Sequence, residues 1–316
     1  MTINSPKPPR RPRILLSNDD GVDSPGIWAL YQAIHAIADT IVVAPATERS
    51  ATGHAISVYN HVTLKKHIRE ETDWGYGLDG TPADCVKMAL TTLLKDSPPD
   101  LVISGINRGQ NTGTSIIYSG TVAAALEATM NGFPAFAISL AVLAPFKGEP
   151  LPKSFWEEGG LGSLGQNVAD YIPAAKFAAR LALIVIEKGL PPGVLLNVNV
   201  PMIPEEEIQG VTISKMGQSL FVDEFQVVSE IDGSTAYRNI GDRLIQSPHG
   251  DDWDDLILHQ NKISVTPLHY DMTHHEFMTQ LKQWAIEEDQ TTREVSEQVA
   301  ANLGEPLNAN ISGPKR

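Results

Sequence analysis

The amino-acid sequence predicts an α/β protein built around a mostly parallel β-sheet. Short apolar runs that suit buried strands alternate with longer segments of helical periodicity, the order expected of repeated βα units. Two of the helical segments begin with Ser-Pro or Thr-Pro, in which the hydroxyl residue suits the helix cap and proline suits the first turn. With 316 residues, 42% of them hydrophobic, the chain can bury a large core.

The elements of the first part of the chain follow from its local patterns. A strand over residues 13–16 leads into an acidic loop and then into a helix that opens with SPGI, and the strand TIVVAP comes next. Residues 45–80 indicate a loop and an antiparallel hairpin, because apolar and polar positions alternate in AISVYNHVTLKKHI. A further helix begins with Thr81 and Pro82.

The middle of the chain continues this alternation. The strand DLVIS leads through a stretch rich in Gly, Asn, Ser and Thr into the helix TVAAALEATM, which Asn131 and Gly132 terminate. The strands PAFAISLAV and VLLNVNVP complete the predicted sheet, with the helix AAKFAARLALIVIEKG between them. Residues 144–172 are rich in Gly and Pro and are predicted to form an inserted loop.

The two ends of the chain differ from this core over residues 13–200. Residues 1–12 are basic but are not followed by an apolar segment, so we expect a disordered tail, with an organellar address as the alternative. Over residues 201–316, charged residues, turn formers and isolated β-like runs replace the βα order. We expect this region to form a C-terminal arm or subdomain.

Composition restricts the partners and the compartment. The formal net charge of −14 argues against a nucleic acid polymer or an anionic membrane as partner, whereas a small anionic ligand fits where a cation offsets the field. The single cysteine, Cys85, excludes an internal disulfide and a thiolate zinc site, so we expect the reducing environment of the cytoplasm. No apolar run approaches the roughly 20 residues of a membrane-spanning helix.

The first loop places Asn18, Asp19 and Asp20 directly after an apolar strand. Two like charges ~4 Å apart repel by about 4 kcal/mol at an effective dielectric constant near 20, and a divalent cation between them turns this repulsion into attraction. Ligands of open α/β sheets bind at the carboxyl ends of the strands, where this loop lies. We therefore predict a metal site; the alternative is that one Asp caps the helix and the other is solvated.

Two further loops at this edge carry polar side chains. APATERSATGH contains Ser50, and SGINRGQNTGTSIIYSGT contains Asn107, Asn111, Ser119 and Thr121. The latter loop has neither the P-loop pattern nor the GxGxxG of a dinucleotide fold, which argues against an ATPase or a dehydrogenase. Its SGT sequence before an Ala-rich helix offers backbone N–H groups and the hydroxyls of Ser119 and Thr121 as a phosphate cradle, unless a hydroxyl only caps the helix.

The three loops together combine oxygen ligands for a metal with hydrogen-bond donors for an anion. Oxygen ligands favour Mg²⁺, Mn²⁺ or Ca²⁺ over zinc or copper. This combination indicates metal-assisted hydrolysis of a phosphoester, in which the cation polarises the phosphoryl oxygen and activates water.

Five sequence blocks are distinctive when they are taken in order: ILLSNDDGVDSPGI, VVAPATERSATGHAIS, GTPADCVKMAL, PDLVISGINRGQNTGTSIIYSGTVAAALEA and ISVTPLHYDMT. In this order they resemble the SurE family, the survival-protein 5'/3'-nucleotidases. The resemblance runs from about residue 13 to about residue 140 almost without a gap and resumes near LLNVNVP and ISVTPL.

The resemblance implies a three-layer, Rossmann-like catalytic core of the SurE type and an enzyme that hydrolyses nucleoside monophosphates. The implied class is a phosphoric monoester hydrolase, a 5'-nucleotidase, with 3'-nucleotidase and exopolyphosphatase activities as further expectations. It also implies one divalent ion per subunit, Mg²⁺ or Mn²⁺, and a homodimer or homotetramer in which the arm over residues 201–316 is exchanged between subunits.

The same resemblance assigns roles to individual residues. Asp19 and Asp20 match the catalytic residues and acidic metal ligands, Ser50 the hydroxyl ligand and Asn107 the amide ligand. The phosphate-binding and substrate-binding set comprises Asn18, Asn111, Ser119, Gly120 and Thr121. Asn261 and Lys262 depart from the family, which has a Gly-aromatic pair before the SVTPL strand. The loop over 144–172 is also longer than expected, so both departures bear on assembly and substrate preference.

Histidines and tryptophans receive more modest roles. His269, His274 and His275 are expected to cap, to lie at the surface or to lie at an interface, because neighbouring side chains point apart more often than together. His54 beside the second loop is ambiguous. Three tryptophans are expected to pack or to lie at interfaces, namely Trp74, Trp253 and Trp284.

Two rival functions stay open at the level of sequence. An aspartyl-phosphate phosphatase would also place an acid after the first strand, but it calls for a DxD spacing and a downstream lysine, which the third loop lacks. A noncatalytic nucleotide-binding stress adaptor on the same fold is the other alternative. The preferred nucleotide, the position of its phosphate and the identity of the general base are not determined by the sequence.

Overall fold

The computed structural model describes residues 10–69, 72–142, 163–222, 224–239, 243–245, 247, 250, 252–284 and 299. The chain divides into two compact units, residues 1–270 and residues 271–316. The predicted basic tail lies outside the described residues up to residue 9, and the predicted inserted loop over 144–172 lies outside them up to residue 162.

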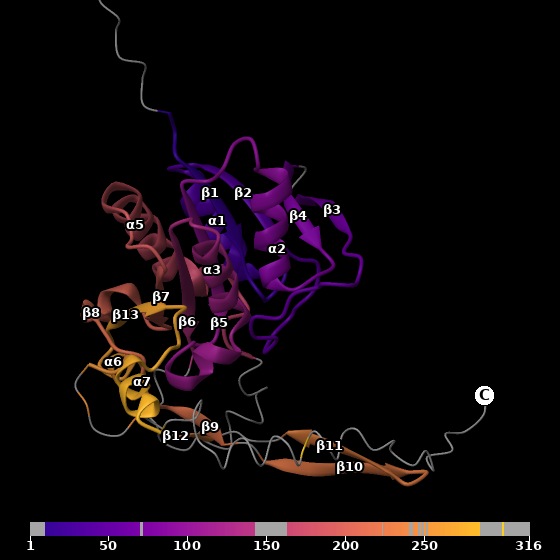
Figure 1. Ribbon diagram of the computed structural model, residues 1–316. Coiled ribbons are helices and arrows are strands. Elements are labelled where there is room, and N and C mark those ends of the chain that lie inside the picture. Colours follow the sequence, from indigo (N-terminus) through magenta and orange to yellow (C-terminus); the bar gives the residue numbers. More distant parts are fainter. Residues whose placement is uncertain are drawn as a thin grey trace, which may run out of the picture. The chain divides into compact units, whose positions relative to one another are not determined.

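The first unit is built on a nine-stranded sheet of order β3-β4-β2-β1-β5-β6-β7-β13-β8 (Figure 1). Its strands are β1 (Arg13–Ser17), β2 (Asp39–Pro45), β3 (Leu64–Arg69), β4 (Thr72–Leu78), β5 (Leu101–Arg108), β6 (Ala135–Ala141), β7 (Val194–Pro201), β8 (Val211–Ile213) and β13 (Ile263–His269). Neighbouring strands are parallel except in the pairs β3–β4 and β13–β7. The predicted α/β architecture with a mostly parallel sheet is confirmed.

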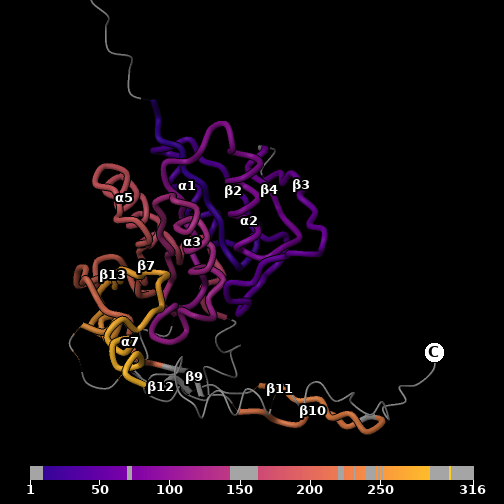
Figure 2. The backbone as a smooth tube through the Cα atoms, in the orientation of Figure 1, coloured from indigo at the N-terminus to yellow at the C-terminus, as the bar shows by residue number. Residues whose placement is uncertain are grey.

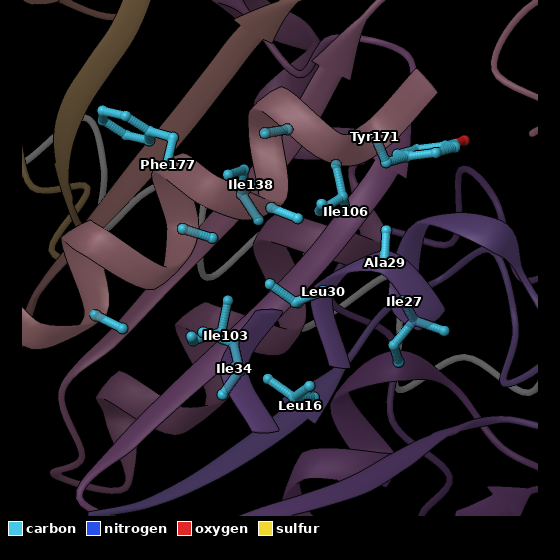
Figure 3. Close-up of a cluster of buried hydrophobic side chains, with 14 of the residues drawn as sticks. Leu16, Ile27, Ala29, Leu30, Ile34, Ile103, Ile106, Ile138, Tyr171 and Phe177 are labelled. Atoms are coloured by element: carbon cyan, nitrogen blue, oxygen red, sulfur yellow. The ribbon is translucent and has the colours of Figure 1, made fainter. Parts of the chain in front are cut away.

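Helices cover both faces of this sheet. The helices of the described residues are α1 (Pro25–His35), α2 (Pro82–Met88), α3 (Gly120–Met130), α5 (Ile172–Lys188), α6 (Asp254–Leu258) and α7 (His275–Lys282). Alternate residues of β1 point to opposite faces: Ile14 and Leu16 join a core with α1 and α5, and Leu15 joins a core with α2 and α3. Figure 3 shows the first of these cores, in which Leu16, Ile103 and Ile138 of the sheet face side chains of α1 and α5. The core therefore has three layers.

Local chemistry accounts for the helix ends. Thr81 accepts a hydrogen bond from the backbone of Asp84, whose side chain accepts one from the backbone of Thr81, so a capping box starts α2. A π-helix, Ala89–Leu93, continues α2. Ser119 caps α3, and Asn131 ends it as predicted. The predicted antiparallel hairpin is also confirmed as β3 and β4, although residues 55–62, the first half of the alternating stretch, form no strand.

Strands beyond residue 200 contribute to the same sheet. β13 pairs with β7 along its whole length and with β8 on its other side, and Figure 2 shows β13 beside β7. The sheet of the core thus extends into the segment that the sequence analysis assigns to a C-terminal arm. Four further strands form two-stranded antiparallel pairs: β9 (Leu220–Val222) with β12 (Arg243–Ile245), and β10 (Phe225–Ile231) with β11 (Ser234–Asn239).

Short 3-10 segments lie at Gly113–Tyr118, Val168–Tyr171 and Glu205–Glu207. α7 belongs to the second unit, of which residues 271–284 and 299 are described. None of the helices in the described part of the chain combines the length and the apolar character that crossing a membrane requires.

Candidate active site

The strand order changes direction at β1. The chain leaves β1 toward β2 on one side and later returns as β5 on the other side, so β1 lies between them. A crevice forms outside the carboxyl ends of the strands at such a point. The three loops singled out in the sequence follow β1, β2 and β5, and all of them therefore start at this edge.

Asn18 holds the first loop in shape. Its side chain is fully buried, and its Nδ2 donates to the carbonyl of Gly21 at 2.9 Å and to Oγ of Ser24 at 2.8 Å. Gly21 has a φ of +98°, a conformation that disfavours other residues. The structure thus gives Asn18 a part in shaping the loop that carries Asp19 and Asp20.

Asp19 is buried against the start of α3. Its Oδ1 accepts a hydrogen bond from the hydroxyl of Thr121. Gly120 lies so close that a Cβ on it would stand 2.8 Å from Cβ of Asp19 and 3.0 Å from Cγ of Pro82. Burial raises the pKa of Asp19, although the hydrogen bond from Thr121 opposes the rise. Only glycine at position 120 permits this close approach.

Asp20 is half-buried beside it and accepts a hydrogen bond at Oδ2 from the backbone N–H of Arg108, 2.9 Å away. Burial, and then the negative charge of Asp19, raise the pKa of Asp20 to about 7. The nearby Arg108 lowers this pKa, and Glu48 raises it further. The charge of Arg108 thus offsets only part of what burial and the charge of Asp19 add to the pKa of Asp20.

The second loop brings an additional carboxylate to the site. Ser50 is exposed and its hydroxyl donates to Glu48 at 2.7 Å. The charge of Glu48 acts on both Asp19 and Asp20, and the backbone N–H of Arg49 donates to the carbonyl of Asp19 at 2.8 Å. The sequence analysis did not single out Glu48; its place two residues before Ser50 was the available signal.

The third loop supplies amide and hydroxyl groups. Asn107 lies at the end of β5, next to Arg108, and its Nδ2 donates to the carbonyl of Gly109 at 2.7 Å. The Oγ of Ser119 accepts from the backbone N–H of Val122 at 3.1 Å, so this hydroxyl caps α3 and keeps its own proton for another acceptor. The hydroxyl proton of Thr121, by contrast, is donated to Asp19.

Asn111, in the same loop, is buried against strands β6 and β7. Its Nδ2 donates to Oγ of Ser139 on β6 at 2.9 Å, and Asn199 of β7 hydrogen-bonds its backbone. The structure thus links the loop after β5 to Asp19 through Thr121 and to strands β6 and β7 through Asn111. Ser139 and Asn199 were not predicted as functional residues, because the strands PAFAISLAV and VLLNVNVP were interpreted only as members of the sheet.

The donor set agrees with a hard divalent cation. Asp19 and Asp20 are neighbouring carboxylates with raised pKa values, which favour a neutralising positive charge between them. The hydroxyl of Ser50 and the side-chain oxygen of Asn107 are groups of the kind that Mg²⁺ and Mn²⁺ bind. Within the described residues, no group of three or more His, Cys, Asp or Glu side chains is placed to hold a metal ion. The residues present therefore fit a metal bound by two carboxylates and neutral oxygens.

The remaining candidates have structural partners. His54 hydrogen-bonds the buried Glu127 at 2.9 Å, which ties the second loop to α3. His274 caps α7 by accepting from the backbone of Phe277, and His275 pairs with Asp271 at 3.0 Å. These two contacts confirm capping and surface roles.

Aromatic and turn residues also take packing roles. Trp74 is buried edge-on against Trp28, and Trp284 lies edge-on against Phe277. Asn261 has a φ of +56°, a left-handed conformation that asparagine tolerates better than most side chains. This departure from the expected glycine therefore preserves the turn before β13.

The chain is similar to known proteins over most of its length. The model of the family described as "Survival protein SurE" matches residues 14–223. A protein of Carboxydothermus hydrogenoformans described as "5'-nucleotidase SurE" is 39% identical over 275 residues, which cover 86% of this chain and 96% of that protein. The Geobacter metallireducens protein of the same description is 41% identical over 277 residues, covering 87% and 98%. The crystal structure of the Sure protein from Aquifex aeolicus has a TM-score of 0.67 at 31% identity, covering 86% of this chain and 99% of that one.

Proposed function

The chain belongs to the SurE family. We propose that it hydrolyses nucleoside 5'-monophosphates to nucleoside and inorganic phosphate. The single observation that carries the proposal is the buried Asp19–Asp20 pair, packed against the start of α3 through Thr121 and Gly120. Such a site joins negative charge, which binds a metal, to helix N–H groups, which bind an anion.

We assign the metal to Asp19, Asp20, Ser50 and Asn107, with one Mg²⁺ or Mn²⁺ per subunit. When bound, the ion supplies Lewis acidity toward the phosphoryl oxygens and toward the attacking water. One of the two carboxylates accepts the proton that the water releases. The role of Thr121 is to hold Asp19 in place, since its hydroxyl donates to Oδ1.

The phosphate is bound by the loop that precedes α3. The backbone N–H of Gly120 and the hydroxyl proton of Ser119 are the donors that we assign to the anion, at the positive end of α3, whereas the backbone N–H of Thr121 donates to Asp19. The side chain of Asn111 completes the set. These donors stabilise the negative charge that grows on the phosphoryl group during transfer. Since they act on the phosphate alone, we extend the proposal to nucleoside 3'-monophosphates and short polyphosphates.

Assembly and compartment are part of the same proposal. We propose a homodimer or homotetramer formed through the C-terminal segment, as the family resemblance implies. Buried Cys85, whose pKa burial raises, is the only cysteine and suits a reducing compartment such as the cytoplasm.

A substrate and metal panel tests the proposed function. Purified protein of measured oligomeric state is assayed for phosphate release from 5'- and 3'-nucleotides and tripolyphosphate with Mg²⁺, with Mn²⁺ and with EDTA. We expect release from 5'-nucleotides that EDTA abolishes and Mn²⁺ restores. Nucleotide binding without metal-dependent release would instead support a noncatalytic adaptor, and a trapped phosphoenzyme would support an aspartyl-phosphate mechanism.

A further inference from the structure

Two asparagines of β7, Asn197 and Asn199, take no part in the reaction as described, yet both are fully buried and directed at Asn111. The Oδ1 of Asn199 accepts from the backbone N–H of Asn111 at 2.8 Å, and its Nδ2 donates to the carbonyl of the same residue at 3.0 Å. Asn197 donates to that carbonyl as well, at 2.8 Å. One side-chain amide thus pairs with both polar backbone groups of a single loop residue.

The side chain of Asn111 is fixed from the neighbouring strand. Its Nδ2 donates to Oγ of Ser139 at 2.9 Å, and Ser139 on β6 lies opposite Asn199 on β7 in the sheet register. Asn111 is therefore held at its N–H, at its carbonyl and at its side chain by three residues. Its amide group has a second hydrogen, which a phosphate oxygen can accept.

A second anchor lies two residues further on. Both carboxylate oxygens of Asp254 accept from the backbone N–H of Gly113 at 3.1 Å, and Asp254 is fully buried. A Cβ on Gly113 would stand 2.3 Å from Oγ of Ser219, so the backbone is closely surrounded at this point. The segment 111–113 is thus fixed at both ends by side chains that come much later in the sequence.

Placing these polar side chains in the interior has a cost in free energy that their hydrogen bonds must offset. A buried amide costs free energy unless it is hydrogen-bonded, whereas an apolar side chain would fill the interior of a strand without that requirement. The bonds of Asn199 therefore serve the geometry of one loop residue. Preorganised donors are effective when neighbouring groups hold them rigidly.

We propose that Asn199 is a positioning residue for phosphate binding, and that Asn197 and Asp254 assist it. Together they hold segment 111–113 so that Asn111 and the donors at Ser119 and Gly120 face the phosphate. This inference rests on the proposed function.

The test compares Asn199→Leu, which keeps the shape and removes both hydrogen bonds, with Thr266→Val. Thr266 is a matched control, because it is buried on the adjacent strand, opposite Asn197, and hydrogen-bonds Ser214 rather than Asn111. We expect Asn199→Leu to lower kcat/KM by roughly 10- to 100-fold, a loss typical of a displaced catalytic group, and to weaken inhibition by inorganic phosphate. Thr266→Val should leave both parameters near wild type.

Amide hydrogen exchange of the peptide that spans residues 109–119 gives a readout independent of activity. We expect faster exchange in Asn199→Leu than in wild type or Thr266→Val. If Asn199→Leu does not fold, Asn197→Leu, which removes only one donor to the Asn111 carbonyl, should show a smaller change in the same direction.

The outcomes separate the two proposals. Unchanged exchange and unchanged phosphate inhibition in folded Asn199→Leu would overturn the positioning role and leave the nucleotidase proposal intact. An inactive wild-type protein would overturn the nucleotidase proposal, while the exchange data would still decide whether Asn199 fixes the loop.

Discussion

Among the described residues, Asp19–Asp20 and Asp254–Asp255 are pairs of adjacent aspartates with buried members, and their surroundings differ. Asp254 accepts hydrogen bonds from the backbone N–H groups of Gly113, Gly217 and Asp255, the last two at 2.9 Å. Asp19 accepts instead from the hydroxyl of Thr121 and Asp20 from the backbone N–H of Arg108, and the charge of Glu48 raises the pKa of both.

The difference shows that adjacency of two acids does not by itself define a metal site. Asp254 accepts from the backbone of two other segments, at Gly113 and Gly217, so it joins those segments and serves as an anchor. At the first pair, burial and mutual repulsion raise the pKa of Asp20 to about 7. We propose that a cation balances the charge of this pair.

The difference between the two pairs is tested most directly by neutralising one acid in each pair. Asp20→Asn should lower phosphate release at least about 100-fold, because the charge that binds the metal is lost. The metal-free variant should be at least as stable as wild type, since a repulsive neighbour of Asp19 is removed. Phosphate-release assays and thermal unfolding in EDTA measure the two effects.

The matched control is Asp255→Asn in the second pair. Its Oδ2 accepts from the backbone of Ser247, so we expect a loss of stability of about 1–3 kcal/mol and activity within about twofold of wild type. Equal loss of activity in both variants would contradict the distinction between the pairs.

The pH dependence of stability provides a second comparison. The folded state raises the pKa of Asp20 to about 7 and of Asp254 to about 6, in both cases chiefly through burial. A raised carboxyl pKa contributes stability that is complete below the unfolded value near 4 and is lost as pH rises through the folded value. In EDTA, the midpoint of thermal unfolding should therefore fall between pH 5 and pH 8.

Two variants assign this fall to its sources. Asp20→Asn and Asp254→Asn should each flatten the profile in EDTA, and Mn²⁺ should stabilise wild type more at pH 8 than at pH 5, since it competes with protons at Asp20. A midpoint of thermal unfolding that rises from pH 5 to pH 8 in EDTA would contradict the assignment of the pH dependence to Asp20 and Asp254. Glu127, whose pKa is lowered to about 2, makes the stability depend on pH only below about pH 4.5.

The smallest effect on activity is expected for Ser50, an exposed residue of the proposed metal site. Ser50→Ala removes the neutral ligand that we propose, which is exposed to water, so we expect a weaker apparent affinity for Mn²⁺ and a loss of activity of roughly tenfold or less, about 1.4 kcal/mol. Ser57→Ala is the control on the same loop, because Ser57 hydrogen-bonds Asp84 of α2. Metal titrations that coincide for wild type and Ser50→Ala would exclude Ser50 as a ligand.

Much of the core could be predicted from the sequence because its signals are local. Apolar runs, the Thr81 cap and the Asn131 stop determine strands and helices within a few residues. The nearness of Asp19 and Thr121 could also be expected, since both follow parallel strands at the same edge. The sequence could not predict that Thr121 donates its hydroxyl proton to Asp19 whereas Ser119 keeps its proton available. This difference depends on distances of tenths of an ångström.

The parts that could not be predicted depend on long-range contacts. Nothing local to the strand VLLNVNVP indicates that Asn199 meets Asn111, 88 residues earlier. β13 likewise inserts between β7 and β8, which the change of composition near residue 201 did not predict. In both cases a buried partner remote in sequence determines the role of the residue.

The bond between Asp254 and Gly113 joins residues 141 positions apart. A chain emerging from the ribosome carries every predicted metal and phosphate ligand once about 120 residues have been made, but it still lacks this anchor. The anchored geometry of the loop therefore completes late in synthesis, so truncated products that retain the whole ligand set lack the finished pocket.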